Sequence, residues 1–157
     1  MTCRDLISYL EVLDGTRISD LDWRDFESHC GTVLRENGYE VTEGICFSNV
    51  KRKFQIDIVA AGLKHALCID CKAWKRGGGR GRSIRASEDQ LERTMELRSC
   101  LESKGLMHLE ALKLYPALVT LQQEDISIHE GVPIVPFEQL NAFLVNFAYY
   151  EDELARV

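Results

Sequence analysis

The stretch from Phe54 to Trp74 reads FQIDIVAAGLKHALCIDCKAW. It contains two apolar runs, Phe54 to Ala60 and Ala66 to Trp74, that are rich in β-branched and other strand-forming residues. A short connection containing Gly62 joins the two runs, as in strands linked by a tight turn. The stretch is therefore predicted to form a β-hairpin.

Side-chain alternation divides each strand of this hairpin between the two faces of a sheet. In the first strand one face carries Phe54, Ile56, Ile58 and Ala60, and the other carries Gln55, Asp57 and Val59. In the second strand one face carries Leu67, Ile69, Cys71 and Ala73, and the other carries Cys68, Asp70, Lys72 and Trp74. Asp70 and Lys72 are therefore predicted to project together.

The register of the hairpin decides how its two aspartates meet. If the turn is centred on Leu63 and Lys64, Asp57 lies directly across from Asp70. The Cβ atoms of such a pair are roughly 5 Å apart, and opposed like charges destabilise a sheet. A divalent cation between the two carboxylates would remove this conflict.

Mg²⁺ suits this arrangement, because it takes one or two protein carboxylates and fills its other positions with water and phosphate. Mn²⁺ is expected to substitute. Lys72 beside the pair would hold or deprotonate an attacking water, or neutralise charge that builds on a phosphate. The alternative is a solvated face on which Asp57 and Asp70 pair with Lys72 and Lys53. The convergence of two acids and a lysine among apolar residues favours the metal site.

A third carboxylate, Glu27, lies in a helix predicted to begin after a cap at Ser19 or Asp20 and to end at Asn37-Gly38. Two interpretations are open. In one, Glu27 interrupts an apolar stripe and reaches toward the metal or its waters, because burial of an unpaired carboxylate is costly. That stripe consists of Trp23, Cys30 and Leu34. In the other, Glu27 is solvated at the edge of a competing stripe of Phe26, Cys30, Val33 and Leu34.

The rest of the chain alternates between strand and helix patterns. Strands are predicted at about 39–47, 116–121 and 132–135, a second helix runs from Ser87 to about Lys104, and a last amphipathic helix carries Leu140, Phe143, Leu144 and Phe147. The order α-β-β-β-α-β-β-α predicts an α/β fold with a mixed central sheet flanked by helices. The chain is expected to form one domain, with an N-terminal helical extension (1–18), a core (19–148) and a C-terminal tail (149–157).

Gln90 has two interpretations. Ser87-x-x-Gln90 has the form of a capping box, which is a sufficient structural explanation. As a site residue, Gln90 would contact phosphate or a metal-bound water from the helix behind the hairpin.

Basic residues gather directly after the hairpin. The net charge is −6, but residues 72–85 contain six cations and no acid, so the rest of the chain carries −12. Gly77 to Arg82 is predicted to be a flexible loop, either a plain solubilising loop or one whose arginines follow a phosphate backbone. The residues expected to bind nucleic acid are Lys75, Arg76, Arg80, Arg82 and Arg85.

The six cysteines lie in apolar runs and are expected to be reduced core residues. Cys68-x-x-Cys71 has the spacing of a zinc pair, but strand positions three apart point to opposite faces. No second pair completes a zinc site in the sequence. No apolar run approaches the length of a membrane span and no signal peptide begins the chain, so a cytoplasmic protein is expected.

Asp57 followed thirteen residues later by Asp70-Cys71-Lys72 resembles the signature of the PD-(D/E)xK nuclease superfamily. The surrounding elements, from about Asp22 to Leu144, are similar to those of Mrr-type restriction endonucleases and archaeal Holliday-junction resolvases. Ile56 stands where many members carry proline. The resemblance implies a restriction-endonuclease-like αβββαβ core.

The resemblance also implies a set of roles. The metal would be bound by Asp57, Asp70 and the Cys71 carbonyl, with Lys72 serving the water and Glu27 and Gln90 in support. The function implied is Mg²⁺-dependent hydrolysis of phosphodiester bonds in DNA, and cutting both strands with one site per chain would call for a homodimer. The alternative is a module on the same fold that binds nucleic acid or protein without cutting.

Overall fold

The computed structural model describes residues 21–74, 79–105, 112–121 and 125–157, with only the backbone of residues 21–24. They form one six-stranded sheet in the order β1-β2-β3-β4-β6-β5. Its strands are β1 (Glu40–Ser48), β2 (Lys53–Ala61), β3 (His65–Lys72), β4 (Lys113–Thr120), β5 (Ser127–His129) and β6 (Val132–Pro136). Around it lie α2 (Leu21–Glu36), α3 (Gly79–Ser103), α4 (Phe137–Val145), α5 (Phe147–Tyr150) and the short 3₁₀ helix η2 (Glu151–Glu153). The predicted α/β class and the αβββαβ order are confirmed.

The sheet is mixed. β1, β2 and β3 form an antiparallel meander, whereas β4 runs parallel to both β3 and β6. The helix α3 makes the crossover from β3 to β4, as expected for a long helix between parallel neighbours. The sequence analysis did not predict β5, a three-residue strand that pairs with β6 at the edge of the sheet.

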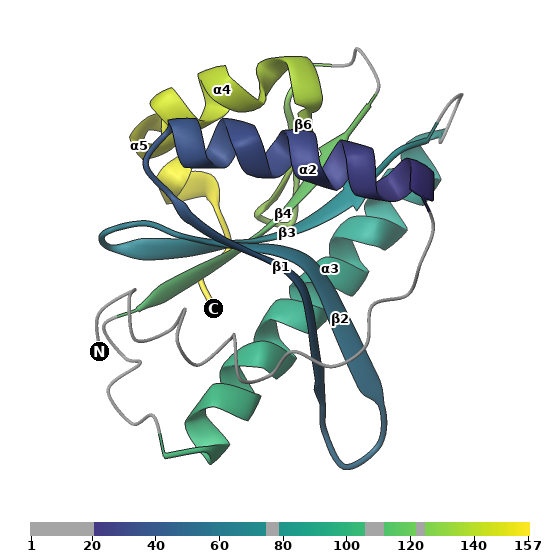
Figure 1. Ribbon diagram of the computed structural model, residues 1–157, viewed down its shortest axis with the longest axis vertical. Helices are drawn as coiled ribbons and strands as arrows, with labels where there is room; N and C mark the ends of the chain where they lie inside the picture. The colour runs from purple at the N-terminus through teal and green to yellow at the C-terminus, as the bar shows by residue number, and fades with distance from the viewer. Residues whose placement is uncertain (1–20, 75–78, 106–111, 122–124) are drawn as a thin grey trace.

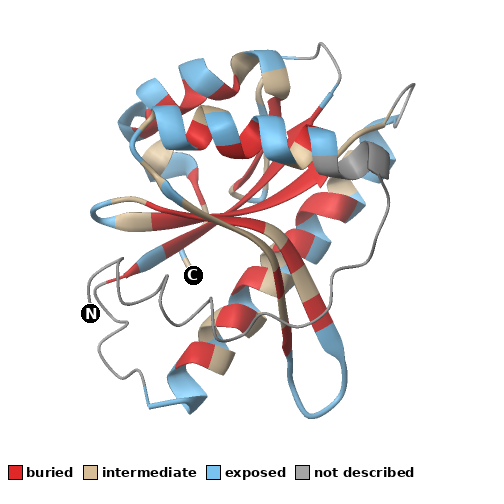
Figure 2. Ribbon diagram, in the orientation of Figure 1, coloured by how far each residue is buried: buried red, intermediate tan, exposed pale blue. Residues whose placement is uncertain are grey.

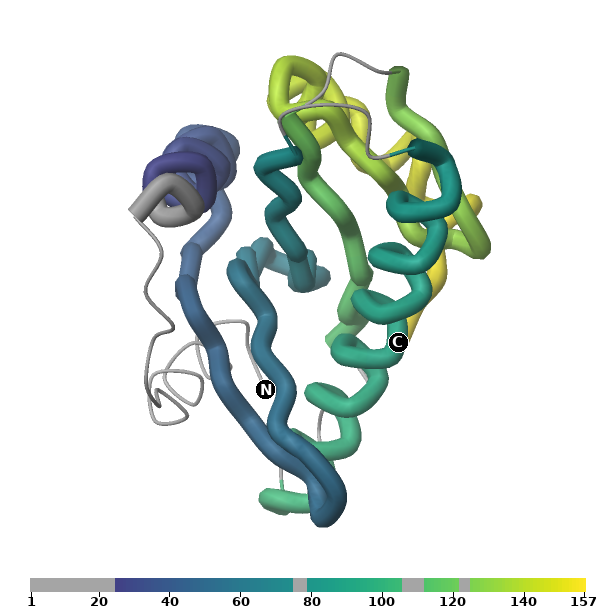
Figure 3. Tube along the Cα trace, turned by 90° about the vertical axis from the view of Figure 1, so that its right-hand side faces the viewer, coloured from purple at the N-terminus to yellow at the C-terminus, as the bar shows by residue number. Residues whose placement is uncertain are grey.

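Helices cover both faces of the sheet, α2, α4 and α5 on one and α3 on the other (Figure 1). Figure 3 shows α2 and α3 on opposite sides of the strands. Buried residues line the sheet and the inner faces of the helices (Figure 2). They form two main clusters. The first joins α2, α4 and α5 to the sheet and includes Phe26, Leu34, Ile69, Phe143 and Phe147. The second joins α3 to the sheet and includes Ile45, Phe47, Cys68, Leu97 and Leu101.

The strand β2 belongs to both clusters. Ile58 and Ala60 pack in the first, whereas Phe54 and Ile56 pack in the second together with Val59 and Ala61. The prediction that Phe54, Ile56, Ile58 and Ala60 share one face is therefore wrong. The change occurs at Asp57. Opposite it in the β1–β2 register lies Gly44, whose φ of +63° bends β1 at that point. Beyond the bend the twisted β1–β2 ribbon curves toward α3 (Figure 1).

The helix α3 begins at Gly79, eight residues before the predicted start at Ser87. Gly79 to Arg82 is therefore helical, not a loop, whereas the preceding part of the predicted loop, Gly77 and Gly78, lies outside the described residues. The early turns are stabilised by packing, because Ala86 is buried against Leu118 and Ile134.

The capping-box interpretation of Ser87 and Gln90 is wrong for the same reason. Ser87 lies inside the helix, and its hydroxyl donates a hydrogen bond to the Ile84 carbonyl at 2.6 Å. A residue in that position has no unpaired helix-terminal N–H to cap.

The predicted C-terminal helix is present, interrupted at Asn146 between α4 and α5. All four of its predicted apolar residues are buried. Val157 exchanges two backbone hydrogen bonds with Leu114, so the last residues pack against the start of β4. None of the described helices is long and apolar enough to cross a membrane. The predicted N-terminal extension and the helix cap at Ser19 or Asp20 lie outside the described residues.

Candidate active site

The β2–β3 ladder ends next to the two aspartates. Its pairs run from Ala61 opposite Ala66 to Ile58 opposite Ile69, and the same register places Asp57 across from Asp70, as predicted. One step beyond the last pair, the Cys71 N–H donates a hydrogen bond to Asp57 Oδ2 at 2.8 Å. A carboxylate thus accepts the bond that a strand carbonyl would otherwise take, and this holds the Asp57 side chain against β3.

Asp70 is buried, with 3% of its surface exposed. Lys72 Nζ lies 2.7 Å from its Oδ2, and Arg93 Nη1 lies 3.3 Å from its Oδ1. Oδ2 itself accepts no hydrogen bond from the described residues, so the Lys72 contact is ionic without hydrogen-bond geometry. The surface-salt-bridge alternative fails on this burial, although its Lys72 to Asp70 pair is present.

The surroundings of Asp57 favour its protonated form. Burial and then the charge of Asp70 raise the pKa of Asp57 to about 8, against a smaller lowering by the Cys71 N–H. With its pKa raised in this way, the Asp57 carboxyl is largely protonated at neutral pH unless a further cation binds next to it. A divalent cation bound by both carboxylates would stabilise their charged forms, because it supplies compensating positive charge. The oxygen donors and the unsatisfied Oδ2 therefore fit a hard cation such as Mg²⁺.

Glu27 lies half-buried on α2, whose Phe26, Cys30 and Leu34 enter the first cluster. The competing stripe is thus the buried one, with Glu27 at its edge. Its charge nevertheless raises the pKa of Asp57, so the carboxylate lies within electrostatic reach of the aspartates. A direct part in metal binding stays a prediction.

Gln90 is fully buried behind β3. Its Nε2 donates to the Cys68 carbonyl at 2.8 Å, and its Oε1 faces Arg93 Nη1 at 3.4 Å. Gln90 thus ties α3 to the strand that carries Asp70. The sequence analysis missed Arg93, although its i, i+3 spacing from Gln90 puts both residues on one helix face.

The described basic residues lie at the start of α3. Arg80, Arg82 and Arg85 are exposed there, and the Arg82 guanidinium lies over the Trp74 ring at 5.6 Å from its centre. Lys75 and Arg76 lie outside the described residues. The cations thus project from the helix that follows the motif strand.

Cys68 and Cys71 lie in different clusters, on opposite faces of the sheet, so they do not form a zinc pair. Burial raises the pKa of Cys68 to about 12. A hydrogen bond with Cys30, together with burial, raises that of Cys71. Such thiols are unreactive, and all cysteines among the described residues are free.

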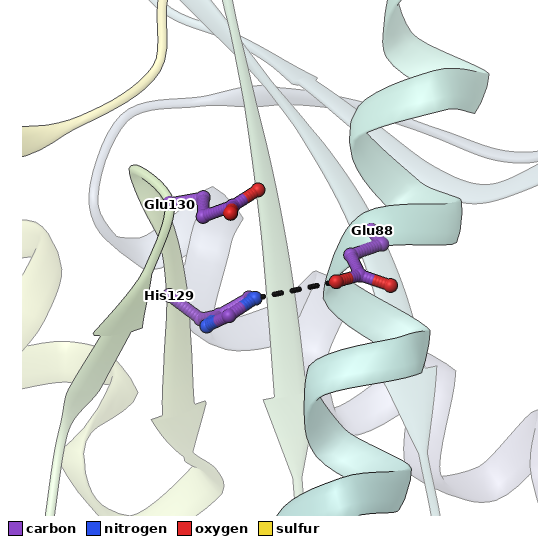
Figure 4. Close-up of side chains that lie close together, drawn as sticks. All are labelled: Glu88, His129 and Glu130. Carbon is purple, nitrogen blue, oxygen red and sulfur yellow. Dashed lines mark ion pairs between the residues drawn. The ribbon is translucent and has the colours of Figure 1, made fainter.

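A second group of polar side chains joins α3 to the β5–β6 turn (Figure 4). Ligand-type atoms of Glu88, His129 and Glu130 lie within 4.8 Å of one another, and His129 Nε2 lies 3.5 Å from a Glu88 oxygen. Both glutamates are exposed, and this group shares no member with the Asp57 and Asp70 pair. The contact between His129 and Glu88 links the edge hairpin to α3.

Comparison with known proteins agrees with this arrangement. The Mrr catalytic-domain family, described as restriction endonuclease, matches residues 18–103, which is more than half of the chain and includes the whole carboxylate site. An uncharacterised protein of Archaeoglobus fulgidus is 26% identical over 128 residues, covering 82% of this chain and 93% of its own.

Two crystal structures show only a distant likeness. A protein of unknown function has a TM-score of 0.42 and 15% identity over 60% of this chain. A protein from Vibrio cholerae has a TM-score of 0.45 and 9% identity over 96% of it. This chain spans 46% and 44% of their respective lengths. The family match is the finding that identifies the chain, and on it the chain belongs to the Mrr-type restriction endonuclease family.

Proposed function

We propose that this protein is a divalent-cation-dependent endonuclease that hydrolyses phosphodiester bonds in DNA. One observation carries the proposal above the others: the buried Asp70 and the half-buried Asp57 lie next to each other with Lys72 alongside. A fold gains nothing in stability from such a pair, because partial burial and the charge of Asp70 make the Asp57 carboxylate costly to ionise. Family membership adds that restriction endonuclease-like domains act on phosphodiesters.

Each residue has a part in this proposal. Asp57 and Asp70 hold the cation, with the Cys71 carbonyl and Glu27 as further oxygen donors. A bound Mg²⁺ lowers the pKa of water and stabilises charge on phosphate. Lys72 orients or deprotonates the attacking water, or offsets charge on the phosphate in the transition state. Gln90 keeps β3 in place through the Cys68 carbonyl.

DNA is the proposed partner. The exposed arginines at the start of α3 provide the positive charge that a polyanion requires, on a chain whose net charge is otherwise negative. Cutting both strands of a duplex with one site per chain would require two copies, so a homodimer on duplex DNA belongs to the proposal. The proposed compartment is the cytoplasm.

Supercoiled plasmid tests the proposal directly. With Mg²⁺ or Mn²⁺ the protein should convert it to nicked or linear DNA, and EDTA should abolish the conversion. Asp57→Asn and Asp70→Asn should each lower the rate by at least about 100-fold, as loss of a group that stabilises transition-state charge does. Without metal, Asp57→Asn should be at least as stable as wild type, because a buried carboxylate is removed.

Glu36→Gln is the matched control. Glu36 is exposed in the last turn of α2, nine residues and roughly 14 Å of helical rise from Glu27, so its removal should leave cutting intact. Undiminished cutting by Asp57→Asn would refute the assignment of Asp57 as a metal ligand. DNA binding without cutting under any divalent cation would favour the non-cleaving module.

A further inference from the structure

Arg93 occupies one side of Asp70. Its Nη1 lies 3.3 Å from Asp70 Oδ1, while Lys72 takes the other oxygen. Gln90 Oε1, 3.4 Å away, gives the guanidinium a second partner. Both oxygens of a proposed metal ligand thus face protein cations.

A hollow of about 260 Å³ adjoins this contact. Arg93 lines it together with Arg52, Lys53, Phe54, Gln55, Asp89 and Glu92. Arg52 is already engaged, by an ion pair with Glu92 and by its position over the Phe54 ring. Arg93, with 29% of its side chain exposed, therefore has room to turn away from Asp70 without leaving the site.

The charge next to the Arg93 guanidinium decides when it would turn away from Asp70. The guanidinium compensates the charge of the buried Asp70 carboxylate, whose burial would otherwise be costly. A divalent cation on Asp70 would lie within a few ångströms of that guanidinium and would repel it. Once released, a planar guanidinium can take two oxygens of one phosphate, which an ammonium cannot do.

We propose that Arg93 is a positioning residue that holds Asp70 until a divalent cation binds and then turns into the adjoining hollow to hold a phosphate of the substrate. This inference rests on the proposed function, because it takes Asp70 as a metal ligand. It adds a competition: protein and metal share one carboxylate, so the metal must displace Arg93 to bind.

The competition predicts opposite effects on two quantities. Arg93→Ala should bind Mn²⁺ roughly tenfold more tightly than wild type, because one like charge next to the site is gone. It should nevertheless cut DNA more slowly at saturating Mn²⁺ and with a higher KM, because the guanidinium that binds the phosphate is missing. Arg93→Lys keeps the positive charge but loses the planar guanidinium that can bind two phosphate oxygens. Its Mn²⁺ affinity should therefore stay near wild type while its KM for DNA rises.

Titration calorimetry with Mn²⁺ and no DNA measures the affinities on folded protein, with circular dichroism as the check of folding. Arg52→Ala is the control, since Arg52 lines the same hollow but pairs with Glu92, and its Mn²⁺ affinity should be unchanged. Arg93→Met keeps the aliphatic stem and replaces Arg93→Ala if that variant does not fold.

The outcomes separate this inference from the proposed function. If Asp70→Asn loses Mn²⁺ binding but Arg93→Ala binds as wild type does, Asp70 is a ligand and the competition is refuted. If Asp70→Asn binds Mn²⁺ as well as wild type does, the assignment of Asp70 as a metal ligand and this inference are both refuted. Tighter Mn²⁺ binding by Arg93→Ala with unchanged KM would keep the displacement and overturn the phosphate contact.

Discussion

Asp57 serves two parts of the molecule at once. Its Oδ2 accepts the Cys71 N–H, which completes the pairing of β2 with β3 beyond their last backbone pair. The rest of the carboxylate is left to meet Asp70, whose charge helps to raise the pKa of Asp57. The backbone of β3 thus sets the position of a side chain on β2, so the geometry of the proposed metal site depends on strand pairing and not on a flexible rotamer.

Lys72 belongs to the same patch but has a separable role. Lys72→Ala should lose cutting rate while keeping most of its DNA affinity, because its ammonium lies on Asp70 Oδ2 and not on an outer surface. A loss of about 100-fold or more in single-turnover rate is expected for a group that stabilises charge in the transition state. The measurement compares that rate with filter binding in Ca²⁺. If affinity collapses in parallel with rate, Lys72 docks DNA and the proposed mechanism is wrong.

The carboxylate pair was predictable from sequence because its geometry is local. A short hairpin turn fixes the register, and the register fixes which residue faces Asp57. Arg93 was not predictable in the same way. It reaches Asp70 from a helix that follows the strand, so its place depends on how α3 is rotated against the sheet. Gln90 and Leu97 set that rotation by packing, and packing leaves only a weak trace in one sequence.

At the scale of elements, α3 presents the basic residues at its start from a helix and not from the predicted loop. Arg80, Arg82 and Arg85 project from helical turns and not from a loop. Their spacing is therefore fixed, and Arg82 is further held over Trp74. A fixed row of cations at the end of the motif strand is better placed to meet successive phosphates than a mobile loop would be.

Removal of two of these cations should show in the salt dependence of DNA binding. Each phosphate contact releases counterions and contributes close to one unit of slope in a log-log plot of affinity against salt. Arg80→Ala with Arg82→Ala should therefore lower the slope by up to about two units, similarly for all sequences, with little change of rate at saturating DNA. Affinities measured by fluorescence anisotropy from low to moderate salt decide this.

The control for that experiment removes two exposed cations elsewhere. Lys64 lies at the β2–β3 turn and Lys104 at the far end of α3, so Lys64→Ala with Lys104→Ala should leave the slope as in wild type. Identical slopes for wild type and the Arg80 and Arg82 variant would mean that DNA enters elsewhere.

The other elements show which patterns carry information. Long runs such as those of β2, β3 and β4 were predicted because many apolar residues agree. The strand β5 was missed because its three residues, Ser127 to His129, are too few to show alternation. The start of α3 was misjudged because Gly79 and Gly81 are poor helix formers, and the burial of Ala86 that supports those turns is a tertiary effect.

At the scale of the whole molecule, the two faces of the sheet carry different tasks. The face under α3 contributes Gln90 and Arg93 to the proposed site. The other face contributes Glu27 from α2, and its part under α4 and α5 is structural. His65 lies on this second face, stacked on Phe147 with ring centres 4.2 Å apart. The Tyr39 hydroxyl lies 2.9 Å from its Nε2.

His65 should make the protein sensitive to acid. Burial lowers its pKa, as does Lys113, against a raising by Glu151. The unfolded chain therefore takes up a proton more readily than the folded one, so stability falls as pH drops below about 6.5. His65→Phe keeps a ring beside Phe147 and cannot be protonated, so its loss of unfolding free energy between pH 7.5 and 5.5 should be smaller.

Urea denaturation at the two pH values measures this difference. His29 is exposed on α2, and His29→Ala should behave as wild type does. An equal loss of stability in wild type and His65→Phe would show that other groups cause the acid sensitivity.

The passage of β2 between the two hydrophobic clusters links the folding of the whole domain to its chemistry. Before Asp57, Phe54 and Ile56 of β2 pack into the cluster under α3. After it, Val59 and Ala61 stay in that cluster while Ile58 and Ala60 enter the other, so neither cluster can open without detaching part of β2. Native-state amide exchange in β2 and β3 should then reflect one cooperative opening. A cation bound by Asp57 and Asp70 at that junction would slow exchange in both clusters together, because its binding energy adds to the free energy of the shared opening.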